Sequence, residues 1–152
     1  MSIKLAPGET RQIDVTLTPL GEWILPTGHI DPDHGWSGEE YGYDGSLGSG
    51  TYTVYKDDDG WTRFLEFTHE AFQCRGCRIY LDTSPRSAGC IADIDVCVDG
   101  TYADVFDGKV SGRAVWNEVF FEPRTITKAR VRFKSTAYQF TIHEFEFYGE
   151  GG

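Results

Sequence analysis

The chain lacks the features of membrane-spanning and exported proteins. No apolar run in its 152 residues approaches the ~20 residues that a membrane-spanning helix needs. The opening residues, MSIKLAPGET, do not follow a basic stretch with an apolar one, as a secretory signal would. We therefore predict no membrane insertion. The expected location is a virion or a cytoplasmic assembly, or outside the cell if a signal has been removed.

Basic residues are also scarce. The sequence has 14 lysines and arginines against 24 aspartates and glutamates, which gives a formal net charge of −10. Because nucleic-acid binding depends on basic residues that neutralise phosphates, this charge excludes nucleic acid as a partner. Such an acidic surface is usually just solvated, although a local cluster can bind a cation such as calcium.

Catalytic signatures are missing as well. His29, His34, His69 and His143 are too far apart for an HExxH-type zinc site. There is no GxSxG elbow, no phosphate-binding glycine loop and no dinucleotide fingerprint. The segment HIDPDH could hold a transition metal, but a solvated loop is the simpler interpretation. We predict no enzymatic activity.

What the sequence does contain is typical of strands joined by tight turns. Aromatic residues make up 14% of the chain and glycines number 18, and this mixture favours strands and turns over helices. Apolar residues alternate with polar ones at Arg11–Thr18, Thr51–Lys56, Trp61–Phe67, Arg78–Asp82, Ile91–Asp99, Tyr102–Phe106, Val115–Phe121, Ala129–Lys134 and Tyr138–Tyr148. We predict a single all-β domain over residues 1–152, a jelly-roll β-sandwich of about eight antiparallel strands.

A long irregular segment interrupts the strand pattern. Between Pro19 and Gly50 the alternation gives way to glycines and aromatic residues. Loops of this length inside a small domain are usually functional or disordered, and the aromatics argue against disorder. We therefore expect this segment to contact a ligand or partner. The later run DDDG at 57–60 predicts a hairpin turn, because its spacing does not fit an EF-hand loop.

The cysteines leave three interpretations open. Cys74, Cys77, Cys90 and Cys97 are spaced C-x2-C-x12-C-x6-C. They could be free thiols, form one or two disulfides, or bind a metal. The single C-x2-C pair is only half of a usual zinc site, which makes metal the least favoured of the three.

Several segments of the second half occur in a recognisable order. They are WTRFLEF, CRIYLDTS, IADIDVCVDGTYADVF, VWNEVFFEPRTITKARVRF and IHEFEFYGE. Together they resemble the discoidin, or coagulation-factor C-type, family over residues 43–149, whereas residues 1–42 match no motif of that family. The resemblance implies a galactose-binding-like jelly roll.

The same resemblance implies a calcium site. The run YDGSLGS resembles a family loop that helps to bind a structural calcium, which points to Asp44, Ser49 and, near the end of the chain, Glu144. Carboxylate and carbonyl oxygens are the ligands that calcium takes. The apolar face of the last strand also changes sides close to Glu144. Either a β-bulge lies there, or Glu144 points inward and needs a partner.

Two binding functions remain open. In one, loops at an end of the sandwich bind a cell-surface glycan, as the resemblance implies, with aromatics stacking on sugar rings and polar groups binding hydroxyls. The candidate residues are Trp36, Tyr41, His34, Arg86, Arg113 and Asn117. In the other, the domain is an assembly or decoration protein, for example on a virus particle, and binds protein subunits. The short chain without an attached catalytic domain slightly favours this second function.

Overall fold

Strands form most of the chain that the computed structural model describes, residues 21–150. The elements are β1 (Glu22–Ile24), β2 (Gly28–Ile30), the 3-10 helix η1 (Glu39–Gly42), β3 (Thr51–Thr53), β4 (Leu65–Ser84), β5 (Cys90–Val98), β6 (Thr101–Val110), β7 (Arg113–Lys134) and β8 (Gln139–Gly149). None of the described helical segments has the length and apolar character to cross a membrane.

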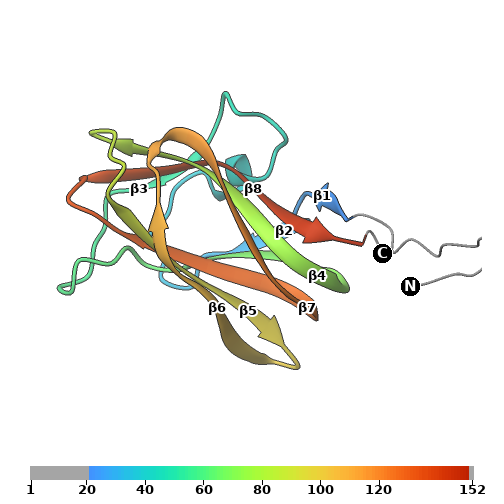
Figure 1. Cartoon of the computed structure of the whole chain (residues 1–152). Helices are drawn as coiled ribbons and strands as arrows, with labels where there is room; N and C mark the ends of the chain where they lie inside the picture. The colour runs from blue at the N-terminus through green and yellow to red at the C-terminus, as the bar shows by residue number, and fades with distance from the viewer. Residues whose placement is uncertain (1–20, 151–152) are drawn as a thin grey trace, which may run out of the picture.

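Two long strands, β4 and β7, connect the two layers of the fold (Figure 1). The antiparallel strands run in the order β1-β8-β4-β7-β5-β6, with β2 added to β4 and β3 added to β8. The later part of β4 pairs with β8, whereas the end of β7 pairs with β5. The sheet thereby folds over on itself, and the predicted all-β jelly-roll sandwich of antiparallel strands is confirmed.

Aromatic side chains fill the space between the layers. Phe67 of β4 stacks on Phe145 of β8, with ring centroids 4.4 Å apart. Phe133 of β7 lies parallel to Phe140 of β8 at 6.0 Å. All four rings are fully buried, so each contributes on the order of 2–3 kcal/mol of hydrophobic stabilisation.

A bulge in β8 explains the change of its apolar face. Tyr80 of β4 pairs with Glu144, but the next residue, Leu81, pairs with Ile142. His143 is therefore the extra residue of a β-bulge, which shifts the alternation by one position. The bulge predicted near Glu144 is confirmed, and it places His143 and Glu144 next to each other at a kink in the strand.

Ion pairs join arginines of β7 to aspartates of β5 on the outer face of these two strands. Arg130 Nε donates to Asp95 Oδ2 at 2.8 Å, and Arg132 Nε donates to Asp93 Oδ2 at 2.9 Å. Both guanidinium groups also lie over the ring of Phe64, at 4.3 and 4.6 Å from its centroid. The arginines and aspartates on this face therefore neutralise one another and stabilise the sheet.

Several of the predicted strand boundaries needed correction. β4 continues through the predicted gap at 68–77 and β7 through the gap at 122–128, because bulges interrupt the alternation without ending the strand. The segment predicted to be an irregular loop contains β1, β2 and η1. The predicted strand Arg11–Thr18 lies outside the described residues.

Candidate functional site

Turns from several parts of the chain meet at the end of the sandwich opposite β1, on the left in Figure 1. They are residues 54–64, 85–89, 111–112 and 135–138. Hydrogen bonds join them: Lys56 Nζ donates to the Ser135 carbonyl at 2.8 Å, and Ser84 Oγ donates to the Tyr138 hydroxyl at 3.2 Å. These segments form one surface, which we call the turn end.

Exposed aromatic rings and cations lie side by side on the turn end. Tyr138 and Tyr55 are 62% and 59% exposed, which is unusual for such large rings. The guanidinium of Arg63 lies 5.9 Å from the ring centre of Tyr55. Lys56 supplies a second cation on this surface, and its ammonium donates to the carbonyl of Ser135. An apolar ring beside placed hydrogen-bond donors is the usual combination of a sugar-binding surface.

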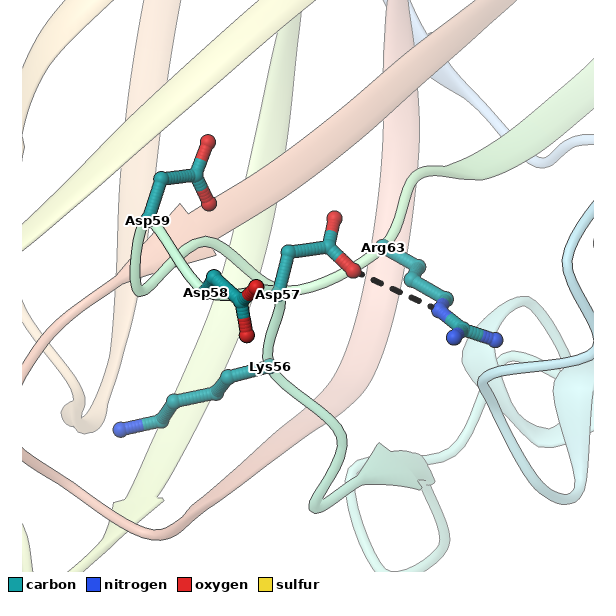
Figure 2. Close-up of a pocket in the computed structure, with 5 residues that line it drawn as sticks. All are labelled: Lys56, Asp57, Asp58, Asp59 and Arg63. Carbon is teal, nitrogen blue, oxygen red and sulfur yellow. Dashed lines mark ion pairs between the residues drawn. The ribbon is translucent and has the colours of Figure 1, made fainter.

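A shallow polar cavity lies on the same end of the sandwich (Figure 2). It has a volume of about 520 Å³ and is lined by Lys56, Asp57, Asp58, Asp59 and Arg63. Asp57 and Arg63 face each other across it, with 3.6 Å between Oδ1 and Nε. The amide of Gly60, at φ 89°, donates to the Asp57 carbonyl at 2.8 Å. The predicted DDDG turn is thus confirmed, and it supplies both donors and acceptors to the cavity.

Two of the predicted ligand-binding residues, Arg86 and Arg113, lie at the turn end. Arg86 Nε donates to Asp82 Oδ1 at 3.0 Å. Arg113 lies opposite Asp82 in the backbone register of β4 and β7. Asn117 has a structural task in the same region: its side chain accepts from the amide of Ser111 at 2.8 Å and donates to the Ser111 carbonyl at 2.9 Å. It therefore shapes the β6–β7 turn.

The predicted candidates from the N-terminal segment are dispersed. Trp36 is 4% exposed, packs edge-on against Phe133 and donates from Nε1 to the Arg63 carbonyl at 3.0 Å. This burial corrects its assignment as a ligand platform, because no face of the ring is free to stack. His34 is exposed beside the Asp33–Arg63 contact, and Tyr41 lies on η1, which packs against β3 and β8.

The sequence interpretation missed Tyr55, Lys56, Arg63 and Tyr138. The first three fall where the predicted strands meet the DDDG turn, and Tyr138 was assigned to the last strand. β8 begins only at Gln139. The polar run Ser135-Thr136 before Tyr138 was a usable turn signal that would have placed its ring in solvent.

The loop at 44–49 lies next to Glu144, as the resemblance implied. Asp44 Oδ1 accepts from the amide of Ser46 at 3.0 Å, and Ser49 Oγ donates to the other carboxylate oxygen of Asp44. The carbonyl of Ser49 accepts a hydrogen bond of 2.8 Å from His143 Nδ1. The structure therefore brings the predicted metal-binding residues Asp44, Ser49 and Glu144 to one place.

Glu144 is a buried acid without a cationic partner among residues 21–150. It is 2% exposed, and although the backbone amides of Gly45 and Ser46 approach its carboxylate, neither oxygen accepts a hydrogen bond of good geometry from them. Burial raises its pKa to about 7, and the charges of Asp44 and Glu146 act in the same direction. The backbone at Gly45 and Ser46 acts in the opposite direction but does not compensate. A cation at this carboxylate would supply a partner of opposite charge.

A second group of acids has a different character. Asp93, Asp95 and Asp104 place one carboxylate oxygen each within 4.8 Å of the others. Burial raises the pKa of Asp93, and the neighbouring Asp95 adds to the effect. Arg130 and Arg132 already pair with Asp95 and Asp93, so this cluster is part of the ion-paired sheet face.

The four cysteines are free, buried thiols. Burial raises the pKa of Cys74 to about 11 and also raises that of Cys77. The structure thus agrees with the first of the three interpretations that the sequence left open, namely free thiols. These thiols pack as small apolar side chains in the core.

Comparison with known proteins places the fold. No family model and no curated protein sequence matches the chain. Among solved structures, a family 32 carbohydrate-binding module (CBM) from Clostridium perfringens NanJ in complex with galactose superposes with a TM-score of 0.69 at 15% identity, over 85% of this chain and 99% of the other. CBM32-1 of a family 31 glycoside hydrolase from the same organism gives 0.67 at 16% identity, over 82% and 96%.

A third similar structure is chitosan-binding module 1 of a chitosanase/glucanase from Paenibacillus sp. IK-5. It has a TM-score of 0.63 and 18% identity, over 83% of this chain and 96% of the other. Similarity at these identities establishes the fold alone. The chain therefore has the galactose-binding-like jelly-roll fold of these carbohydrate-binding modules, and its discoidin character stays a resemblance.

Proposed function

We propose that this domain is a non-enzymatic carbohydrate-binding module that binds glycans at the turn end. The observation that carries the proposal is the exposed ring of Tyr138, held at a turn by Ser84 on the same end of the sandwich as Lys56 and Arg86. A sugar ring can stack its C–H face on such an aromatic ring, while cationic donors bind its hydroxyl groups. The similar structures that bind galactose or chitosan share this fold, which supports the same class of ligand.

The charges of the turn end favour a ligand rich in hydroxyl groups. The cavity wall combines two cations, Lys56 and Arg63, with three consecutive aspartates at 57–59, and the whole chain has a net charge of −10. A polyanion would be repelled by this balance, whereas sugar hydroxyls can both donate and accept.

The assembly function that the sequence slightly favoured receives less support. The similar solved structures are carbohydrate-binding modules, and the exposed aromatics of the turn end fit a glycan without a protein neighbour. We therefore place glycan binding first.

A glycan array tests the proposal, with Tyr138→Ala as the diagnostic variant. Loss of one stacking ring should weaken binding about two- to tenfold, since aromatic contacts of this kind contribute ~0.5–1.5 kcal/mol. Tyr52→Ala is the matched control, because Tyr52 on β3 is also an exposed tyrosine, 44%, and is not among the residues assigned to the glycan. Binding that Tyr138→Ala leaves unchanged, or no hit with any glycan, contradicts the proposal.

We also propose that Asp44 and Glu144 hold a structural calcium ion. The support is the buried carboxylate of Glu144, which lacks a cationic partner among the described residues and faces the loop that contains Asp44. Two carboxylates together with backbone carbonyls of the loop suit a hard cation, and such an ion would tie the loop to β8. Ser49, whose hydroxyl donates to Asp44, would orient that carboxylate.

Metal analysis tests the calcium proposal. Protein loaded with calcium and washed free of unbound metal should retain one equivalent, and a chelator should lower its melting temperature. A washed protein without metal, or a melting temperature that the chelator does not change, contradicts the proposal.

A further inference from the structure

His143, the extra residue of the β8 bulge, lies between the calcium loop and the turn end. Its ring contacts one residue from each side: Ser49 belongs to the 44–49 loop, and Asp82 belongs to the end of β4 that leads into the turn end. The bulge shifts the alternation of β8 by one position at His143, directly before Glu144. The side chains of His143 and Asp82 are only 21% and 24% exposed, so both are held in place by their surroundings.

The contacts run in an unbroken series from the loop to Arg86. His143 Nδ1 donates to the Ser49 carbonyl at 2.8 Å, and its Nε2 lies 3.5 Å from Asp82 Oδ2. Asp82 in turn accepts from Arg86, at 3.0 Å from Nε and 3.4 Å from Nη2. One carboxylate is thus shared between the ring that touches the loop and the guanidinium at the turn end.

Arg86 depends on this carboxylate for its orientation. Its side chain is 64% exposed, and a long side chain in solvent samples many rotamers unless a contact fixes it. A fork of two hydrogen bonds to Asp82 selects one rotamer family. A small movement of Asp82 therefore changes the direction in which Arg86 presents its remaining donors.

We propose that His143 and Asp82 are positioning residues that couple calcium binding in the 44–49 loop to the orientation of Arg86. The proposal rests on the calcium site proposed above. An ion bound by Asp44 and Glu144 fixes the loop, the loop fixes the carbonyl of Ser49, and this carbonyl fixes the ring of His143. Because coupling is reciprocal, a change at Arg86 must alter calcium affinity by the same factor as calcium alters the state of Arg86.

A calcium titration followed by NMR tests the coupling without any glycan. The Nε–Hε signal of Arg86, assigned with Arg86→Lys, should shift as calcium binds to the wild-type protein. In His143→Ala, calcium should still bind through Glu144, within about fivefold of the wild-type affinity, but the Arg86 signal should no longer respond. His69→Ala is the matched control, since His69 Nδ1 contacts only the carbonyl of the adjacent Glu70 in hydrogen bonding.

The variants also separate a direct field effect from the relay. A calcium charge acting through space on Arg86 would shift its signal equally in the wild type and in His143→Ala, and that result overturns the coupling. If His143→Ala proves unstable by circular dichroism, Asp82→Asn replaces it, because this variant interrupts the same series of contacts between His143 and Arg86. His143→Gln, which keeps a donor toward Ser49, should restore part of the response.

The outcomes distinguish this proposal from the others. Calcium binding with an unresponsive Arg86 in the wild type overturns the coupling alone. No calcium binding at all overturns both the coupling and the calcium site, while the glycan proposal, which depends on Tyr138, stays open to its own test.

Discussion

Two buried carboxylates in this domain have opposite surroundings. Asp95 on β5 is 7% exposed and Glu144 on β8 is 2% exposed. Asp95 receives a charged hydrogen bond of 2.8 Å from Arg130, whereas Glu144 accepts no hydrogen bond of good geometry and has no cationic partner among the described residues. Burying a charge is costly unless it is paired. The paired acid therefore belongs to the framework, and the unpaired acid indicates a place that suits a cation.

Proximity of acidic side chains alone does not distinguish a cation site from an ion-paired framework. Asp93, Asp95 and Asp104 place one carboxylate oxygen each within 4.8 Å of the others, yet arginines neutralise two of them. Around Glu144 the charges that shift its pKa are those of the acids Asp44 and Glu146, which raise it further. The sign of the neighbouring charge decides which site takes a cation.

The largest effect is expected when the framework pair is broken. Arg130→Ala leaves Asp95 unpaired and removes the stacking of the guanidinium on Phe64 and Tyr102. The free energy of unfolding should fall by about 3 kcal/mol, as measured by urea denaturation at neutral pH. Arg86→Ala, at an exposed ion pair, is the control and should change stability by less than about 1 kcal/mol. Equal effects of the two variants would remove the distinction between the two kinds of pair.

In the presence of a chelator, Glu144→Gln should stabilise the domain near neutral pH, which is the opposite of the effect expected for Arg130→Ala. Its pKa of about 7 in the folded protein exceeds the ordinary 4.5, so the folded state holds the proton more tightly than the unfolded state does. Wild-type stability is therefore lost as pH rises from 4.5 to 7, and Glu144→Gln removes this loss. The stability of the variant relative to wild type should rise by about 3 kcal/mol across this range.

Thermal unfolding at several pH values, with and without calcium, measures this difference. Excess calcium should reverse it, because the ion stabilises the wild-type carboxylate and not the amide. A constant difference between the two proteins across the pH range contradicts the assigned pKa.

The smallest effect is expected at the rim of the acidic cluster. The pKa of exposed Asp104 is raised by desolvation first and then by Asp93 and Asp95. Asp104→Asn removes a like charge without breaking an ion pair, so it should stabilise the domain by no more than about 0.5 kcal/mol. Urea denaturation at low salt detects this change. A large loss of stability in Asp104→Asn would mean that the carboxylate of Asp104 makes a stabilising contact.

The sequence already contained part of this comparison. In the sequence, Asp93 and Asp95 alternate with apolar residues, and so do Arg130 and Arg132. The change of apolar side in β8 singled out Glu144 as a residue beside a bulge or in need of a partner. Local periodicity carries this information because strands place successive side chains on opposite faces.

The turn end was harder to predict, because its residues come together only through the fold. Tyr138 and Tyr55 are far apart in the sequence, and no periodicity connects the turns that hold them. Trp36 was misassigned for a related reason: its segment resembles an exposed loop, but Asp31 accepts from the Trp36 amide at 2.9 Å and helps to turn the chain so that the ring enters the core. Side-chain burial in irregular segments depends on tertiary contacts.

The comparison of the two acids is tested most directly by calorimetric titration of calcium into three proteins: the wild type, Glu144→Gln and Asp95→Asn. All three should be shown to be folded by near-ultraviolet circular dichroism. We expect the wild type and Asp95→Asn to bind one equivalent with similar affinity. Glu144→Gln should bind at least about tenfold more weakly, since it loses a charged ligand. Wild-type affinity in Glu144→Gln, or its loss in Asp95→Asn, would contradict the account.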